Sequence, residues 1–469
     1  MVAHDRLHGK KFMRLRLPVN GFCHWMETLT LFTMSFLPRR LPEDVLVKIA
    51  LFLGISVLLV LIIAVYFRFV PKRDEPEFPP AQPSCVRCVP ASRADESSQQ
   101  EIVAHARAHP NVSSVVTRYD QMSCFDLFAF ERRADLRHAR SFKVSPRLCY
   151  GCNQMTTVSH GNYVFSCVSC GSKFLRRRHF SSPQTNKVAL VIGGRTKLGH
   201  QIALKLLMAG ATVVVTSRYP AKVQAMFDEY VTRGLSSGWE PSRLVAYPAA
   251  LDLDVANLRA ALDELRGFID ARWGHLDILV NSAAQTIRCR EKQGTGGGEG
   301  ETNKYGDAKF VAPTSVNSWQ MALEDLAQAE MEEVFRVNAV APTLIVQALL
   351  PLLRASVAAP YIINVHAREG LLSLRKSRFH MHTNFGKASL HMLTKCLIAH
   401  KFVTVHGAAF RVHGVDPGWI SVDEYYEMDR PWLVPPLDEV DGAARVLFPL
   451  FCNMLSCWKT RRHFDQLVI

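Results

Sequence analysis

The chain has 469 residues, 48% of them hydrophobic, which is enough for a sizeable core and for two or three folded units. Its 12 cysteines, in a chain of this length, do not indicate a small disulfide-rich scaffold. The formal net charge of +14 leaves two interpretations open. One is an acidic partner such as a phosphate ligand, anionic lipid or nucleic acid, and the other is a basic tail and linker attached to an ordinary enzyme.

Residues 49–67 form an apolar run without a charged residue, with Lys48 before it and Arg68 after it. At the helical rise this run spans about the 30 Å of bilayer hydrocarbon, so it predicts one membrane-spanning helix rather than a buried core helix. Residues 1–48 form a basic tail. Because basic residues flank both ends of the run, the positive-inside rule gives no orientation, and the endoplasmic reticulum and the mitochondrion both remain candidate locations.

Residues 68–147 are predicted to form a linker rich in proline, serine and charge, followed by a basic helical segment. Cys85 and Cys88 form an isolated pair with the spacing Cys-x-x-Cys. A single pair at this spacing predicts no particular site, and incidental spacing or lipid attachment explain it equally well.

Two further Cys-x-x-Cys pairs lie in residues 148–180, Cys149 with Cys152 and Cys167 with Cys170. Their separation is typical of zinc-ribbon ligands, because each pair turns two thiolates towards one point and two pairs complete a tetrahedron. We expect a structural zinc ion, since four sulfur ligands leave no open position for chemistry. Such a site favours a reducing compartment, and two disulfides or free thiols are the alternatives.

A basic run at residues 176–178 follows the second cysteine pair. It permits an alternative interpretation in which residues 132–179 bind nucleic acid. The membrane segment and the lack of interleaved aromatic residues count against a nucleic-acid partner, and a solvated connector is the simpler interpretation.

From residue 187 the pattern predicts alternating strands and helices. An apolar run at 187–192 precedes a glycine loop, an amphipathic helix and a second apolar run at 212–216. This order is typical of the βαβ unit that binds a dinucleotide, with Gly193 permitting the turn and Gly199 permitting close packing of helix on sheet. The fold class predicted for residues 187–469 is α/β, a Rossmann-type doubly wound parallel sheet.

The glycine loop resembles that of the short-chain dehydrogenase/reductase family, Thr-Gly-x-x-x-Gly-x-Gly, with Ile192 in place of the threonine and Lys197 in place of the middle glycine. Five further landmarks of the family follow in the same order: Asp252 in strand three, Asn281 after strand four, Asn338 in a helix, strand five at 362–365, and Pro417 with Gly418 after strand six. The resemblance covers residue 187 to the C-terminus. It points to a divergent branch in which a cysteine-rich module precedes a dehydrogenase-like domain.

The resemblance implies a bound nicotinamide nucleotide. Strand two ends in Ser217 and Arg218 instead of the carboxylate that binds the ribose hydroxyls of NAD, so NADP is favoured, while NAD stays open. The positions that the resemblance assigns to the cofactor, with the loop cations added, are Gly193, Arg195, Lys197, Leu198, Gly199, Ser217, Arg218, Asp252, Leu253, Asn281, Ala283, Lys387, Pro417 and Gly418.

The family's catalytic pair, Tyr-x-x-x-Lys, is only half matched. Lys387 aligns with the lysine, but Thr383 stands at the tyrosine position, and a threonine hydroxyl is a much weaker acid. The family's serine falls at His366 or Ala367. In this interpretation Asn338 helps to order a water, Lys387 holds the ribose, and Thr383 or His382 replaces the missing acid.

The sequence therefore predicts a membrane-anchored, NADP-dependent oxidoreductase-like protein that transfers hydride to or from a carbonyl or alcohol whose identity stays unknown. The alternative is a catalytically impaired NADP(H)-binding protein that acts as a sensor or scaffold at a membrane. Family members often pair through helices of this domain, so the resemblance also implies a homodimer.

Overall fold

The structure, a computed structural model, describes residues 141–285, 305, 319, 321–374, 376–420 and 435–454. The chain divides into two compact units, Met1–Gln82 and Pro83–Ile469, and every described residue belongs to the second. The predicted basic tail, the membrane helix at 49–67, Cys85, Cys88 and most of the linker lie outside the described residues.

The first described element is a small cysteine module (residues 141–179), a three-stranded antiparallel sheet of order β1-β2-β3 followed by one helix. The prediction that residues 141–147 end a helical segment is wrong. Half-buried and exposed side chains alternate from Ser141 to Ser145, the period of a strand, and Phe142 pairs with Ser159. The elements are β1 (Ser141–Leu148), β2 (Met155–His160), β3 (Tyr163–Cys167) and α6 (Val168–His179).

A six-stranded sheet of order β6-β5-β4-β7-β8-β9 forms the centre of the second part, and each neighbouring pair of its strands is parallel. This confirms the doubly wound Rossmann-type sheet. One placement was wrong: Asp252 lies in the loop after β6, which ends at Ala246, and not in the strand. The strands are β4 (Val188–Ile192), β5 (Thr212–Thr216), β6 (Leu244–Ala246), β7 (Ile278–Asn281), β8 (Tyr361–Val365) and β9 (Arg411–Val415).

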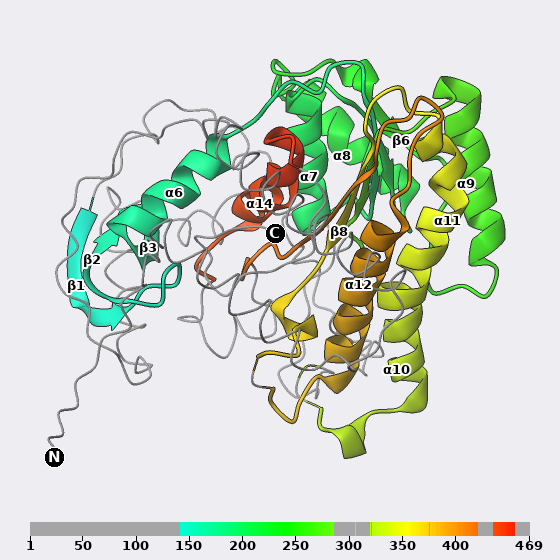
Figure 1. The fold of residues 1–469 in the computed structure, drawn as a ribbon. Coiled ribbons are helices and arrows are strands. Elements are labelled where there is room, and N and C mark those ends of the chain that lie inside the picture. Colours follow the sequence, from blue (N-terminus) through cyan, green and yellow to red (C-terminus); the bar gives the residue numbers. More distant parts are fainter. Residues whose placement is uncertain are drawn as a thin grey trace, which may run out of the picture. The chain divides into compact units, whose positions relative to one another are not determined.

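Helices cover both faces of this sheet, as Figure 1 shows. Strand residues such as Val213 and Val215 face α7, α8 and α14, while Leu190 and Val214 face α9, α11 and α12. The strands are buried on both sides, which explains their continuous apolar runs. The helices are α7 (Lys197–Met208), α8 (Pro220–Thr232), α9 (Leu258–Trp273), α10 (Gln328–Phe335), α11 (Ala341–Arg354), α12 (Met381–His400) and α14 (Glu439–Phe451), with short turns η2 (Pro241–Arg243), η4 (Leu323–Asp325), π-helical η5 (Arg336–Val340) and η6 (Arg368–Gly370).

Within the described ranges, one helical stretch is long and apolar enough to cross a membrane, Gln328–Arg354. Half of its most apolar window is buried, and α11 packs against α9 and the sheet. We therefore interpret it as a core helix of the α/β domain. It does not test the membrane helix predicted at 49–67.

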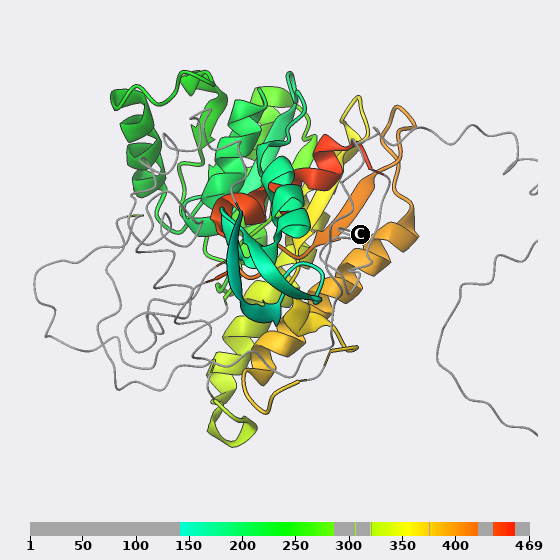
Figure 2. The same cartoon turned by 90° about the vertical axis from the view of Figure 1, so that its left-hand side faces the viewer.

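The cysteine module packs directly on the α/β domain. Helix α6 runs beside α14 in both views (Figures 1 and 2). Arg178 of α6 forms ion pairs with Asp438, at 2.6 Å, and Asp441, at 3.0 Å, and all three side chains are buried. Arg178 is therefore part of an internal contact and does not belong to a basic surface for nucleic acid.

Candidate functional site

A cavity of about 960 Å³ lies where the carboxyl ends of the parallel strands meet. This is the place where doubly wound sheets bind their ligands, and the volume suits a cofactor-sized molecule. Among the positions predicted to contact the cofactor, those that line the cavity are Gly193, Arg195, Lys197, Leu198, Gly199, Ser217, Arg218, Asp252, Leu253, Ala283, Lys387, Pro417 and Gly418.

Two of the loop's glycines, Gly193 and Gly199, are required by its geometry. Gly193 has a φ of +78°, and a Cβ built on it would lie 2.8 Å from the Cβ of Ala283. A Cβ on Gly199 would lie 2.2 Å from the carbonyl oxygen of Gly193. Only glycine fits at either position, so the backbone can approach a ligand at the N-terminus of α7, where free N–H groups favour an anion.

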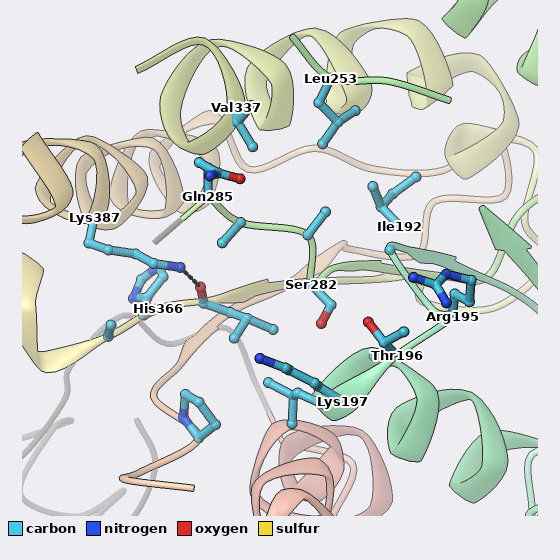
Figure 3. Close-up of a pocket in the computed structure, with 18 of the residues that line it drawn as sticks. Ile192, Arg195, Thr196, Lys197, Leu253, Ser282, Gln285, Val337, His366 and Lys387 are labelled. Carbon is cyan, nitrogen blue, oxygen red and sulfur yellow. Dashed lines mark hydrogen bonds between the residues drawn. The ribbon is translucent and has the colours of Figure 1, made fainter. Parts of the chain in front are cut away.

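Lys197 explains how the loop tolerates the loss of the family's middle glycine. Its φ is +51°, in the left-handed region that glycine adopts at no cost. The chain keeps the conformation with a lysine at an energetic cost. Figure 3 shows the Lys197 and Lys387 side chains directed into the same space from α7 and α12, with Arg195 at the other end of the cavity.

Three cations surround the ring of Tyr219 at the end of β5. The guanidinium carbons of Arg195 and Arg218 lie 5.4 and 5.9 Å from the ring centroid, and the Lys222 ammonium lies 5.4 Å from it. Tyr219 lines the cavity and is 48% exposed. Sequence reasoning found the two arginines and missed Tyr219 and Lys222, although both follow Ser217 within five residues.

Asn281 and Asn338 are two of the predicted site residues that do not line the cavity, and each is hydrogen-bonded to a neighbouring segment. The Nδ2 of Asn281 donates to Oδ1 of Asn364 at 2.8 Å, a bond between adjacent strands β7 and β8. Asn338 accepts a hydrogen bond from the backbone N–H of Gln285 at 2.8 Å and donates one to its carbonyl at 2.6 Å. Gln285 lines the cavity, so Asn338 fixes part of the cavity wall.

The lysine of the half-matched pair is buried beside the cavity. Lys387 donates to the carbonyl of Val365 at 3.1 Å, and burial lowers its pKa to about 8, despite the opposing charges of Glu369 and Asp416. Thr383 lies one helical turn earlier and lines the same cavity, as does Ala367. A group with a pKa near 8 exchanges protons readily at neutral pH.

The histidines are poorer candidates for the acid. His382 is 1% exposed and does not line the cavity, and burial lowers its pKa. His366 lines the cavity, but burial, together with His391 and Lys387, lowers its pKa well below 6.5. Its Nε2 is hydrogen-bonded to the Thr394 hydroxyl at 2.8 Å. We therefore expect both rings to be neutral at physiological pH.

The four cysteines of the module meet at one point. The sulfur atoms of Cys149, Cys152, Cys167 and Cys170 all lie within 4.8 Å of one another. Hydrogen bonds from Cys167 and Cys170 lower the pKa of Cys149 to about 2, whereas burial raises that of Cys152 to about 12. Four cysteine sulfurs at this spacing match the donor set of a tetrahedral zinc ion, which would hold them as thiolates.

Comparison with known proteins finds similarity to short-chain dehydrogenases. The family model described as short chain dehydrogenase matches residues 187–296. An uncharacterised protein of Acanthamoeba polyphaga mimivirus is 34% identical over 359 residues, covering 68% of this chain and 74% of that protein. That match covers more residues than 187–469 contains, so it extends into the region before residue 187.

Further relatives carry dehydrogenase or reductase names. A rhamnolipid-biosynthesis 3-oxoacyl-(acyl-carrier-protein) reductase of Pseudomonas aeruginosa is 29% identical over 235 residues, which cover 50% of this chain and 72% of that protein. Among solved structures, the Pseudomonas aeruginosa RhlG/NADP active-site complex is 23% identical, covers 54% of this chain and 83% of its own, and has a TM-score of 0.39. A short chain dehydrogenase from Burkholderia cenocepacia in complex with NADP is 20% identical, with coverages of 57% and 91% and a TM-score of 0.41.

Proposed function

This chain belongs to the short-chain dehydrogenase/reductase family, and we propose that it is an NADP(H)-dependent oxidoreductase that interconverts a carbonyl and an alcohol. The observation that carries the choice of NADP is the group of cations at the end of β5. Arg195 and Arg218 line the cavity there, and no acidic residue follows β5 before Asp228. Guanidinium groups pair well with a 2′-phosphate, and no carboxylate at this point repels it.

The rest of the cavity fits the other parts of the nucleotide. The α7 N-terminus, opened by Gly193 and Gly199, would hold the pyrophosphate, and Asp252 lies where the family places the acid beside the adenine. Lys387 would hold the nicotinamide ribose. When bound, the nucleotide supplies or accepts the hydride, and the protein binds, orients and exchanges the proton.

Lys387 is the residue best placed for the proton. Its ammonium is buried beside the cavity, and its pKa of about 8 allows it to protonate an alkoxide oxygen or to accept a proton from an alcohol near neutral pH. The Thr383 hydroxyl, on the same wall, would hydrogen-bond the substrate oxygen and orient it. Asn338 acts on the cavity indirectly, because its hydrogen bonds fix Gln285 in the cavity wall.

The remaining parts of the chain are assigned as follows. The four clustered cysteines would hold one structural zinc ion. The apolar run at 49–67 would anchor the chain in the membrane of the endoplasmic reticulum or the mitochondrion, with the described residues in a reducing compartment. Two copies of the chain would form a homodimer, as the family resemblance implies.

A second candidate function follows from two side chains. Thr383 stands at the position of the family's tyrosine, and the family's serine falls at His366 or Ala367, so the usual proton donor is absent. In this alternative the chain binds NADP(H) without turnover and reports its presence to a partner at a membrane.

NADPH absorbance distinguishes the two functions. The purified chain is incubated with NADPH and a panel of ketones, aldehydes and quinones, beside the Lys387→Ala variant. A substrate-dependent loss of absorbance that Lys387→Ala abolishes supports the oxidoreductase. Tight NADPH binding with no turnover on any substrate supports the sensor.

Cofactor choice is tested with one arginine. Arg218→Ala is expected to weaken NADPH binding about tenfold, the effect of losing one charge-assisted contact of about 1.5 kcal/mol at an exposed position, and to leave NADH binding unchanged. Arg233→Ala, at an exposed arginine paired with Glu229 at the end of α8, is the matched control. Equal losses for NADPH and NADH would contradict the proposed 2′-phosphate contact.

A further inference from the structure

The loop after β9 forms one wall of the cavity and is held by the cysteine module. Trp419 and Ile420 line the cavity. The backbone N–H of Trp419 donates to the hydroxyl of Tyr150 at 2.8 Å, and a Cβ on Gly418 would lie 3.2 Å from that hydroxyl. Tyr150 stands between Cys149 and Cys152, so the loop is bonded to a residue inside the first cysteine pair.

The apolar core of the module is completed by the α/β domain. Leu437 is fully buried in the cluster that contains three of the cysteines, and Ile420 packs against the same cluster. Ile420 also contributes to the cavity wall. The side chains around the cysteines and the side chains around the cavity are therefore in direct contact.

A third contact fixes the start of α14. The Tyr163 hydroxyl donates to Asp441 at 2.6 Å, and Arg178 holds Asp438 with two hydrogen bonds of 2.6 and 2.8 Å. Asp438 is the N-cap of α14, and its carboxylate accepts the backbone N–H of Asp441. The next residue, Glu439, lines the cavity.

We propose that the cysteine module is part of the nucleotide site, and that metal binding at its four cysteines is coupled to nucleotide binding in the cavity through Tyr150. The inference rests on the proposed function for the identity of the nucleotide. Tyr150 is a positioning residue: it touches no ligand, and it holds the backbone of the wall at Trp419. When the cysteines enclose a metal, Tyr150 is fixed between two ligands and the wall is formed.

Such coupling is reciprocal. If the metal strengthens nucleotide binding by some factor, the nucleotide strengthens metal binding by the same factor, and couplings of this kind lie at about 5–150-fold. We expect removal of the metal to weaken NADPH binding by roughly tenfold or more. Loss of the Tyr150 hydroxyl alone removes one of the three contacts, so a weakening of about fivefold is expected from Tyr150→Phe.

The test uses the purified full-length chain with Zn²⁺ and NADPH as probes. Zinc content is measured by elemental analysis, and NADPH affinity by fluorescence titration, before and after zinc removal with a chelator. We expect weaker NADPH binding by the zinc-free chain and slower zinc loss in the presence of NADPH. Tyr150→Phe is expected to retain zinc and to bind NADPH more weakly.

Tyr247→Phe is the matched control, because Tyr247 is buried against Phe268 on the other face of the sheet and does not line the cavity. Its NADPH affinity is expected to equal that of the parent. Equal NADPH affinity with and without zinc, together with parental affinity in Tyr150→Phe, would overturn the coupling and leave the proposed function standing. No NADPH binding by the zinc-loaded chain would overturn both. If zinc removal unfolds the chain, Tyr150→Phe decides alone.

Discussion

Replacing Arg178 with methionine is expected to destabilise the chain strongly, because it leaves two carboxylates buried without their cation. Arg178 and Asp438 each have a side chain 1% exposed, and that of Asp441 is 3% exposed. Methionine keeps much of the volume and removes the charge. Breaking a buried ion pair by removing one partner costs about 3–5 kcal/mol.

The pH dependence gives the effect a signature. Burial already raises the pKa of Asp441 to about 6 against the opposing charge of Arg178. A carboxyl whose folded pKa is raised stabilises the fold fully below its unfolded pKa, 3.8, and loses that contribution as the pH rises through the folded value. Without Arg178 the pKa rises further, so the destabilisation by Arg178→Met is expected to be larger at pH 8 than at pH 5.5.

Thermal unfolding measures this effect. At roughly 2–4 °C per kcal/mol for a domain of this size, the expected decrease in Tm is on the order of 10 °C at pH 8. Arg176→Met is the control, since Arg176 is an exposed arginine of the same helix. A decrease for Arg178→Met no larger than that for Arg176→Met, or independent of pH, would refute the buried contact between the cysteine module and α14.

Two further substitutions follow from the cavity. Lys197→Gly is expected to raise the free energy of unfolding by about 1 kcal/mol, because glycine adopts the φ of +51° without strain; thermal unfolding measures this effect. The same variant is expected to bind NADPH more weakly because it lacks the ammonium, and calorimetric titration measures that effect. A lower Tm would contradict the strain at this position. Lys387→Met is expected to stabilise the fold by about 3 kcal/mol at pH 7, since a pKa lowered from 10.5 to about 8 means that burial disfavours the ammonium. Between pH 8 and pH 10.5 the unfolded parent binds more protons than the folded parent, so the stability of the parent rises over this range. The same rise in Lys387→Met would contradict the lowered pKa of Lys387.

The sequence was sufficient for features that depend on local pattern. The apolar runs gave β4 and β5 within one residue, and the loop glycines were correctly identified because their role is a backbone property. The order of family landmarks placed Lys387 and Pro417 at the cavity. These features can be predicted without knowing which distant segments of the chain are in contact.

The sequence did not predict the direction of side chains or the contacts between distant segments. Asn281 turns into the sheet because Asn364 of the neighbouring strand offers an acceptor, and nothing in its own segment shows this. The sequence predicted a solvated basic run that includes Arg178, because its partner Asp438 lies 260 positions away in the chain. Tyr219 was missed because its ring matters only when the cations of two separate loops converge on it.

The central claim is that the cavity is an NADP(H) site. Calorimetric titration of the full-length, zinc-loaded chain with NADPH and with NADH tests it most directly. The expected result is one NADPH site per chain, with NADPH bound at least tenfold more tightly than NADH because Arg195 and Arg218 face the 2′-phosphate. Absence of binding by either nucleotide would contradict the account and leave the Rossmann-type sheet as a structural scaffold alone.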